Sequence, residues 1–369
     1  MLVEKFSGSD TIQSIKMINK ILSLITHDVG IDLGTANTLI MVRGQGIVVR
    51  EPSVVARARK SKQILAIGEE ARRMLGKTPG TIEAIRPLQG GVIADFDATE
   101  AMLKYWIKRI HSGGGWLPKI PRPRVAIGIP AGVTEVERRA VQEAALAAGA
   151  REAFLIEEPM ASAIGAGLPV LEAEGQIIVD IGGGTSEIAV ISLGGIVINR
   201  SIRIAGDEMT EAVVNFSRTK YGLIIGEITA EELKISIGSA EPFPKEKEKG
   251  ALVHVARGRD METGLPKSVK FTSTEIREAI SDVVQQIVFN ISELIEETPP
   301  ELVSDLIKHG LVMTGGGGLL RGLPELVAEK IKMPVWLADR AQETVVRGCA
   351  LVLEKPELLK RVRVVGGLR

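Results

Sequence analysis

Two stretches of the sequence join an aspartate to a glycine turn and a threonine at the end of an apolar run. The first reads VGIDLGTANTLI over residues 29–40, and the second reads VDIGGGTSEIAV over residues 179–190. Glycine loses more conformational freedom on folding than any other residue, so runs of glycine need a reason. Backbone amides that converge in a turn form an anion-binding concavity. The repeated pattern therefore predicts a phosphate site between two related halves of the chain.

The polar side chains of these turns suggest how a phosphate is held. Thr35 and Thr185 add hydroxyls beside the amides, whereas Asp32 and Asp180 would repel a phosphate. The two aspartates make sense if a divalent cation, Mg²⁺ with its waters, lies between them and the phosphates. A purely structural tight turn explains one such stretch but not two with matched spacing. The chain has neither a Walker A lysine motif nor a G-x-G-x-x-G fingerprint.

A third glycine cluster, LVMTGGGGLL, spans residues 311–320. An apolar strand stops in four glycines, and we expect an amphipathic helix after them. This turn lacks an acid, so it predicts either a cradle for an α-phosphate or a surface against a nucleoside. The four glycines are Gly315, Gly316, Gly317 and Gly318.

The elements around the turns alternate between strands and helices. From residue 29 the chain reads as a β-meander, with a hairpin at residues 44–46 and a strand edge or bulge at Pro52. We expect helices over residues 69–75 and 98–110, and a third helix capped by Thr134. This alternation favours an α/β fold with mixed sheets flanked by helices.

The composition narrows the class of protein. With 46 basic and 46 acidic residues the net charge is zero, so there is no global signature of nucleic-acid binding. The single cysteine, Cys349, excludes an intramolecular disulfide and fits a reducing compartment, and the four histidines show no metal-ligand spacing. No apolar run reaches about 18 residues, so no membrane span is predicted. These features predict a soluble intracellular protein.

Two segments have unassigned apolar residues. Residues 11–26 place Ile15, Ile18, Leu22 and Ile25 on one broad helical arc and lysines opposite, which predicts a helix that either packs on the protein's own body or lies on a membrane surface. Lysines within the apolar stretch argue against a signal peptide. The pair Trp116 and Leu117 follows three glycines and precedes three prolines. This pair is either a local packing anchor or a membrane contact.

The motifs together resemble a known superfamily. GIDLGTANT, IEEPMASAIGAG, VDIGGGTSEIAV and LVMTGGGGLL are similar to the phosphate-1, connecting, phosphate-2 and adenosine motifs of the actin, Hsp70 and sugar-kinase ATPases. REPSVVA and GAREAFLIEEPMASAIGAGLPV narrow the resemblance to MreB/Mbl-type bacterial actins, over residues 29 to about 353. It implies an actin-like ATPase fold of two related halves around a nucleotide cleft. The implied boundaries are a membrane-binding segment at 1–28, domain I at 29–175 with 341–369 returning to it, and domain II at 176–340 with a small insertion near 211–270.

The resemblance also implies site residues. It assigns ATP and Mg²⁺ as cofactors, with Asp32 and Asp180 holding the metal through water. Glu158 would orient the attacking water with help from Thr185, although a charge at a helix N-terminus is the simpler explanation of Glu158 by itself. Glu157 should point elsewhere. The implied nucleotide-binding residues are Gly34, Thr35, Ala36, Asn37, Gly182, Gly183, Gly184, Thr185, Glu231, Glu232, Lys234, Gly315, Gly316, Gly317 and Gly318.

The implied function is that of an ATP-dependent cytoskeletal protein. It would polymerise into membrane-associated filaments with slow hydrolysis linked to polymerisation, and would organise cell-wall elongation to maintain rod shape. Expected partners are other copies in paired antiparallel protofilaments, the inner membrane surface, and membrane proteins of the elongation machinery, with no nucleic acid. The alternatives are a small-molecule (sugar-type) kinase, for which we find no further aspartate motif, and an Hsp70-like chaperone, for which no substrate-binding domain follows before Arg369.

Overall fold

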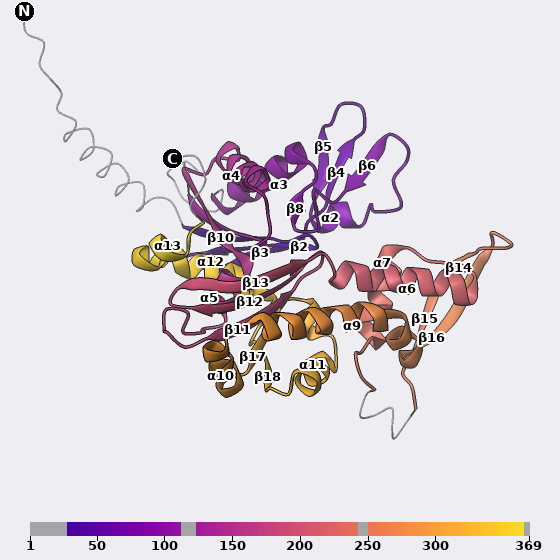
Figure 1. The fold of residues 1–369 in the computed structure, drawn as a ribbon. Coiled ribbons are helices and arrows are strands. Elements are labelled where there is room, and N and C mark those ends of the chain that lie inside the picture. Colours follow the sequence, from indigo (N-terminus) through magenta and orange to yellow (C-terminus); the bar gives the residue numbers. More distant parts are fainter. Residues whose placement is uncertain (1–27, 112–122, 243–249, 365–369) are drawn as a thin grey trace, which may run out of the picture.

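Two five-stranded sheets built on one plan form the centre of the molecule (Figure 1). The computed structural model describes residues 28–111, 123–242 and 250–364. The first sheet has the order β10-β9-β1-β2-β3 and the second β13-β12-β11-β17-β18. In each sheet three adjacent strands run parallel. The middle strand of the sheet, β1 or β11, is one of these three and also begins an antiparallel meander. The sheets therefore repeat the same topology, as the two matched sequence motifs predict.

The strands of the two central sheets have the following bounds. The first sheet consists of β1 (Val29–Leu33), β2 (Asn37–Val42), β3 (Gly46–Pro52), β9 (Arg124–Ile129) and β10 (Glu152–Glu157). The second consists of β11 (Gln176–Ile181), β12 (Ser186–Ser192), β13 (Gly195–Ile202), β17 (Leu311–Thr314) and β18 (Val335–Leu337).

Three smaller sheets are attached to this centre. The predicted meander stops after β3, because β4 pairs with β5 and β6 in a separate sheet. The β4–β6 sheet and the β14–β16 sheet lie on the same side of the molecule, at the right of Figure 1. The small strands are β4 (Val55–Ala58), β5 (Ile64–Ile67), β6 (Ile82–Ile85), β7 (Leu88–Gln89), β8 (Val92–Ile93), β14 (Leu223–Ile224), β15 (Val253–Asp260) and β16 (Pro266–Thr272).

The helices begin and end largely where local signals place them. Thr134 caps α4 with a full capping box, as predicted, whereas the helix expected over residues 69–75 ends at Arg72. The helices are α2 (Glu69–Arg72), α3 (Phe96–His111), α4 (Glu135–Ala147), α5 (Glu158–Gly165), α6 (Gly206–Tyr221), α7 (Glu227–Ile237), α9 (Ser273–Glu297), α10 (Pro300–His309), α11 (Leu323–Ile331), α12 (Thr344–Glu354) and α13 (Pro356–Val362), with short 3₁₀ turns η1 (Gly317–Leu319) and η2 (Ala341–Glu343). Among the described residues, no helix has the length and apolar character needed to cross a membrane.

A helix pair joins the two sheets. Each sheet has its own apolar core, and a third core combines residues of both sheets with α5 and α12. The two helices meet at their backbones: a Cβ at Gly165 would lie 1.8 Å from the Thr344 carbonyl oxygen, and one at Gly348 would lie 1.9 Å from the Ala161 carbonyl oxygen. Only glycine permits this approach. The α5–α12 pair thus fixes the two sheets relative to one another, with the cleft on one side of it.

Candidate functional site

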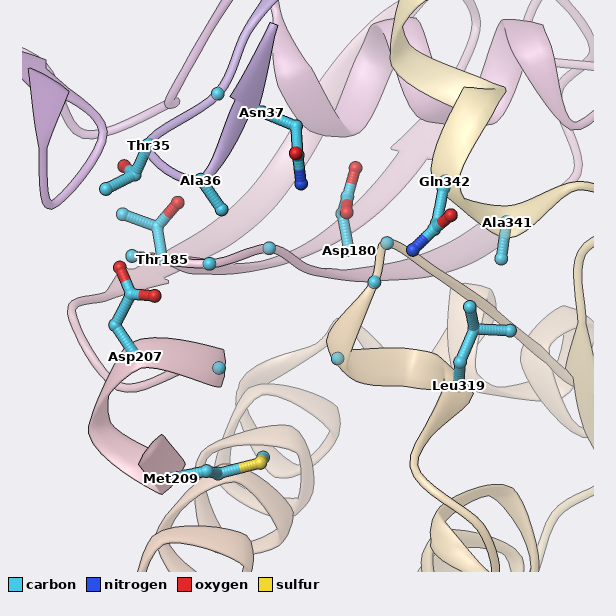
Figure 2. Close-up of a pocket in the computed structure, with 18 of the residues that line it drawn as sticks. Thr35, Ala36, Asn37, Asp180, Thr185, Asp207, Met209, Leu319, Ala341 and Gln342 are labelled. Carbon is cyan, nitrogen blue, oxygen red and sulfur yellow. The ribbon is translucent and has the colours of Figure 1, made fainter. Parts of the chain in front are cut away.

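A cavity of about 570 Å³ opens between the strand ends of the two sheets (Figure 2). Its volume lies in the range of cofactor-sized ligands. Both halves contribute to it, and most of the predicted site residues meet there. The predicted residues that line it are Asp32, Gly34, Thr35, Ala36, Asn37, Glu158, Asp180, Gly182, Gly183, Gly184, Thr185, Glu231, Lys234, Gly315, Gly316 and Gly317.

The sheet topology brings the two aspartates to equivalent places. Asp32 lies near the end of β1 beside Gly128 of the parallel strand β9, and Asp180 lies near the end of β11 beside Thr314 of the parallel strand β17. Ligands of α/β sheets bind outside the carboxyl ends of such strands. The repeated sequence motif therefore becomes a repeated position in space, with both aspartates on the same cavity.

The glycines of the second turn let the two halves approach closely. A Cβ at Gly183 would lie 2.8 Å from the Cβ of Ala36, and a Cβ at Gly184 would lie 2.7 Å from the Oγ1 of Thr35. A side chain at either position would push the opposing turns apart. These glycines therefore allow the close approach of the two halves in addition to the predicted approach of a phosphate.

The third turn packs against the end of β11. Gly315 has φ +81°, and a Cβ there would lie 2.2 Å from the Ile181 carbonyl oxygen and 2.4 Å from Oδ1 of Asp180. Gly317 is equally restricted, since its Cβ would lie 2.3 Å from Cγ2 of Ile181. The helix expected after these glycines is α11. It begins at Leu323, after the 3₁₀ turn η1.

Acidic side chains are buried together in the cavity. Burial, and then the negative charge of Asp180, raise the pKa of Asp32 to about 8. Burial raises the pKa of Asp180 to about 6, although hydrogen bonds from Ser162 and Thr314 act in the opposite direction. Burial, and the charges of Glu187, Asp32 and Asp180, raise the pKa of Glu158 well above its usual range. The site therefore holds more negative charge than its own polar groups neutralise.

The buried acids favour a cation that they hold through water molecules and not by direct contact. A divalent cation near Asp32 and Asp180 would favour their ionised forms and remove their mutual repulsion. Within residues 28–111, 123–242 and 250–364, no three His, Cys, Asp or Glu side chains are arranged to bind a metal directly. Two carboxylates on opposite strand ends thus fit an ion that keeps several of its waters, as Mg²⁺ does.

Glu158 is both the first residue of α5 and part of the cavity wall. The helix-terminus explanation and the catalytic explanation are therefore compatible. A Cβ at Gly128 on β9 would lie 2.6 Å from Cγ1 of Val345 and 3.4 Å from Cγ of Glu158, so the Glu158 side chain lies next to this part of β9. Glu157, the preceding residue, does not line the cavity.

Lys234 connects α7 to the start of α6. Its Nζ donates to the Gly206 carbonyl oxygen (2.7 Å) and to Oγ1 of Thr210 (2.8 Å), and burial lowers its pKa. The backbone amide of Asp207 in turn donates to the carbonyl oxygen of Gly183 (2.7 Å). The beginning of α6 is thereby held against the second glycine turn.

Two predicted residues do not reach the cavity. Glu232 is exposed on α7, because one residue of a helix turns the side chain by about 100° away from Glu231. Gly318 is buried behind the turn, where a Cβ would lie 3.0 Å from Cγ of Met313. Neither residue therefore joins the other predicted residues at the cavity.

Several cavity residues carry no prediction from the sequence. In Figure 2, Thr35 and Thr185 lie at one end of the view, and Leu319, Ala341 and Gln342 at the other. Gly206, the first residue of α6, was a usable signal, since a helix that opens after a strand is a common anion site. The η2 residues had no such signal. The residues missed are Leu39, Arg50, Gly91, Gly206, Asp207, Met209, Ile235, Gly238, Leu319, Leu320, Arg321, Ala341, Gln342 and Val345.

The predicted membrane residues lie outside the described part of the chain. They are Ile15, Ile18, Leu22 and Ile25 of the N-terminal segment, and Trp116 and Leu117.

Comparison with known proteins matches the chain to one family over most of its length. A family model described as MreB/Mbl protein matches residues 26–361. The cell shape-determining protein MreB of Escherichia coli (strain K12) is 51% identical over 342 residues, which cover 92% of this chain and 96% of that protein. The cell shape-determining protein Mbl of Bacillus subtilis (strain 168) is 46% identical over 338 residues, with coverage of 92% and 99%.

Solved structures agree with this match. The crystal structure of MreB5 of Spiroplasma citri bound to ADP has a TM-score of 0.83 and 35% sequence identity, and covers 91% of this chain and 98% of that one. MreB5 bound to AMPPNP also gives a TM-score of 0.83, with 36% identity and coverage of 90% and 97%. The predicted actin-like α/β fold is confirmed. With its two repeated sheets, its glycine-lined cavity and these relatives, the chain belongs to the MreB/Mbl family.

Proposed function

We propose that this chain is an ATP-dependent bacterial actin homologue that polymerises into membrane-associated filaments and organises cell-wall elongation to maintain rod shape. The observation that carries the proposal is a cavity formed by three glycine turns and two opposed aspartates in a member of the MreB/Mbl family. The names of the E. coli and B. subtilis relatives, and the nucleotides bound to MreB5, support it. The sugar-type kinase is not favoured, because the relatives over 92% of the chain are cell shape-determining proteins.

The cavity suggests how ATP lies. The phosphates would face the amides of residues 34–37 and 182–185, and the adenosine would lie between α7 and the third turn, because these segments line the cavity. Glu231 and Lys234 would flank the adenosine, opposite residues 315–317. Asp32 and Asp180 would hold Mg²⁺ through water, and the ion would supply positive charge beside the phosphates.

Hydrolysis needs a water molecule held in line with the γ-phosphate. Glu158 supplies a carboxyl at the cavity wall that can accept a proton from this water, and Thr185 supplies a hydroxyl in the opposing turn. Glu158 is the first residue of α5, which packs against α12, and Thr185 lies between β11 and β12 of the second sheet. The positions of both residues are therefore set by the packing of these elements. We propose slow hydrolysis that is linked to polymerisation.

We also propose the domain division implied by the sequence. Domain I comprises 29–175 with 341–369, and domain II comprises 176–340 with a small insertion near 211–270. Two separate apolar cores, one within residues 29–155 and one within 177–333, support it. The packing of α12 on β1 and β9 supports the return of the chain to domain I.

Membrane attachment is proposed for residues 1–28 and for Trp116 and Leu117, on the cytoplasmic face of the inner membrane. Paired antiparallel protofilaments and membrane proteins of the elongation machinery would be the protein partners. An amphipathic helix with lysines on its polar face is suited to an anionic lipid surface. This part of the proposal rests on the sequence pattern and on the family.

Electron microscopy of the purified chain with Mg-ATP and anionic liposomes tests the proposal. Paired filaments lying on the lipid are expected. Removal of residues 1–27, or the substitution Trp116→Ser, should reduce liposome binding while polymerisation continues. Bare liposomes with monomeric, ATP-binding protein would contradict the filament assignment, and unchanged lipid binding in both variants would contradict the membrane assignment.

A further inference from the structure

Glu187, the second residue of β12, is a buried acid without a role in the hydrolysis described above. Its side chain is 1% exposed, and burial raises its pKa to about 7. Glutamate is almost never fully buried unless it is paired, because desolvation of the carboxylate is costly. The position therefore calls for an explanation from its contacts.

The Glu187 carboxyl joins the two halves of the molecule. Oγ of Ser201, its cross-strand partner on β13, donates to Oε1 (2.6 Å). The backbone amide of Ala131 donates to Oε2 (3.2 Å). Ser201 belongs to the second sheet, whereas Ala131 lies in the turn after β9 of the first sheet. One carboxyl thus holds a turn of the first half against a strand of the second.

This turn lies directly behind the phosphate end of the cavity. A Cβ at Gly91 would lie 2.5 Å from Cγ of Pro130 and 3.1 Å from Cγ2 of Thr185. On the other side of the turn, a Cβ at Gly132 would lie 3.2 Å from Cβ of Ser201. Residues 130–132 therefore contact the β13 strand that Glu187 contacts, and Gly91 lies between Pro130 and the threonine of the second glycine turn.

The same turn continues the strand that supports Glu158. Gly128 of β9 faces Cγ of Glu158, and Ile129 is the register partner of Glu157 on β10. A shift of the turn would move the end of β9 and hence the surface against which the Glu158 side chain rests. The negative charge of Glu187 also acts on Glu158, as the largest contribution after burial to its raised pKa.

We propose that Glu187 is a positioning residue for ATP hydrolysis: it ties the 130–132 turn of the first half to the second half and thereby holds Glu158 in place at the phosphate end of the cavity. The inference rests on the proposed ATPase function and extends it. Glu187 does not line the cavity and is not expected to touch the nucleotide. Its effect should therefore appear in the hydrolysis step and not in nucleotide affinity.

The substitution Glu187→Met tests this in the full-length chain. Methionine keeps nearly the length of the side chain, but its thioether is only a weak acceptor for the Ser201 hydroxyl and the Ala131 amide. The single-turnover rate of ATP hydrolysis should fall by about 10- to 100-fold, as expected for a misplaced reacting group. The dissociation constant for Mg-AMPPNP, and the fraction of protein that sediments with AMPPNP, should stay within about twofold of the parent values. A general loss of structure would instead reduce nucleotide binding and sedimentation together with the rate.

Two further variants sharpen the test. Ser201→Ala removes one hydrogen bond and keeps the carboxylate, so a smaller loss of rate is expected. Glu293→Gln is the matched control: Glu293 of α9 pairs with Arg200, the neighbour of Ser201 on β13, without contact to the turn. It should hydrolyse ATP at the parent rate.

Three results would overturn the inference. The first is hydrolysis by Glu187→Met at the parent rate. The second is a loss of AMPPNP binding as large as the loss of rate. The third is an equal loss of rate in Glu293→Gln. If the parent chain neither binds AMPPNP nor hydrolyses ATP, the proposed function is wrong as well.

Discussion

Buried acids and closely packed glycines in the cavity wall lower the stability of the folded chain when no ligand is bound. Asp32, Asp180 and Glu158 are buried near one another, and their pKa values are raised. A ligand that binds only the folded state stabilises it by RT ln(1 + [L]/Kd). A nucleotide with its cation would therefore stabilise this site both by mass action and by neutralising the acids.

Glu158→Gln should separate hydrolysis from nucleotide binding. The glutamine keeps the size of the side chain but cannot take a proton from water, so the rate of phosphate release should fall by roughly 100-fold or more. Affinity for Mg-ADP should remain near that of the parent chain. Glu157→Gln is the matched control, because the preceding residue does not line the cavity. An equal loss of rate in both variants would contradict the assignment of Glu158.

Gly315→Ala should abolish nucleotide binding. The methyl group would meet the Ile181 carbonyl oxygen at 2.2 Å and Asp180 at 2.4 Å, so the third turn and the end of β11 must separate. Gly264→Ala is the matched control: Gly264 has a similar φ of +74°, but a Cβ there has no neighbour within 4 Å among the described residues. Isothermal titration with Mg-ADP measures the difference. Unchanged affinity in Gly315→Ala would contradict the role of this turn.

At the element scale, two ion pairs connect the β4–β6 sheet region to α7 beside the cavity. Arg72, at the end of α2, pairs with Glu231 (3.2 Å), and Arg86, directly after β6, pairs with Glu227. Glu231 also lines the cavity. These two pairs, which we name the α7 clasp, hold opposite walls of the cleft together.

Removal of the α7 clasp should speed nucleotide release. In the double variant Arg72→Ala/Arg86→Ala, dissociation of a fluorescent ADP analogue, followed by stopped flow, should be about 2- to 10-fold faster, because partly exposed ion pairs contribute little each. Arg73→Ala is the control, since Arg73 pairs with Glu69 within its own helix. A release rate equal to that of the control would show that the clasp does not limit opening.

At the scale of the whole molecule, two repeated sheets enclose one ligand site and are joined by the α5–α12 pair. In the proposed filament the outer surface provides the contacts between copies. Val136, the second residue of α4, is 77% exposed, the highest value among the large apolar side chains of the described residues. We propose that this helix takes part in inter-strand pairing.

Val136→Asp should therefore disturb pairing without affecting ATP binding. In a symmetric pair the same surface faces itself, so each added charge meets its copy. Electron micrographs should show single instead of paired filaments, while Mg-ADP affinity remains unchanged. Leu193→Asp is the control, because Leu193 is also exposed, in the turn between β12 and β13. Paired filaments in Val136→Asp would remove α4 from the interface.

Local patterns in the sequence predict the chemistry of the turns and much of the local structure. Asp32, Gly34 and Thr35, and their counterparts from Asp180 to Thr185, predict a phosphate and cation site because anion binding by converging backbone amides depends on residue type and near neighbours. The cap at Thr134 follows from a four-residue pattern, and the alternation of strands and helices follows from hydrophobic periodicity. These signals are local, and the structure retains them.

Only the tertiary structure decided which distant residues join the site. Gln342 and Met209 enter the cavity, and Glu232 and Gly318 do not, because helix phase and the packing of η1 set their directions. The contact of Glu187 with the turn after β9 also has no local signal. This contact depends on the register of β12 against β13 and on the α5–α12 pair, which sets the two sheets side by side. Such non-local geometry is fixed only when the whole core packs.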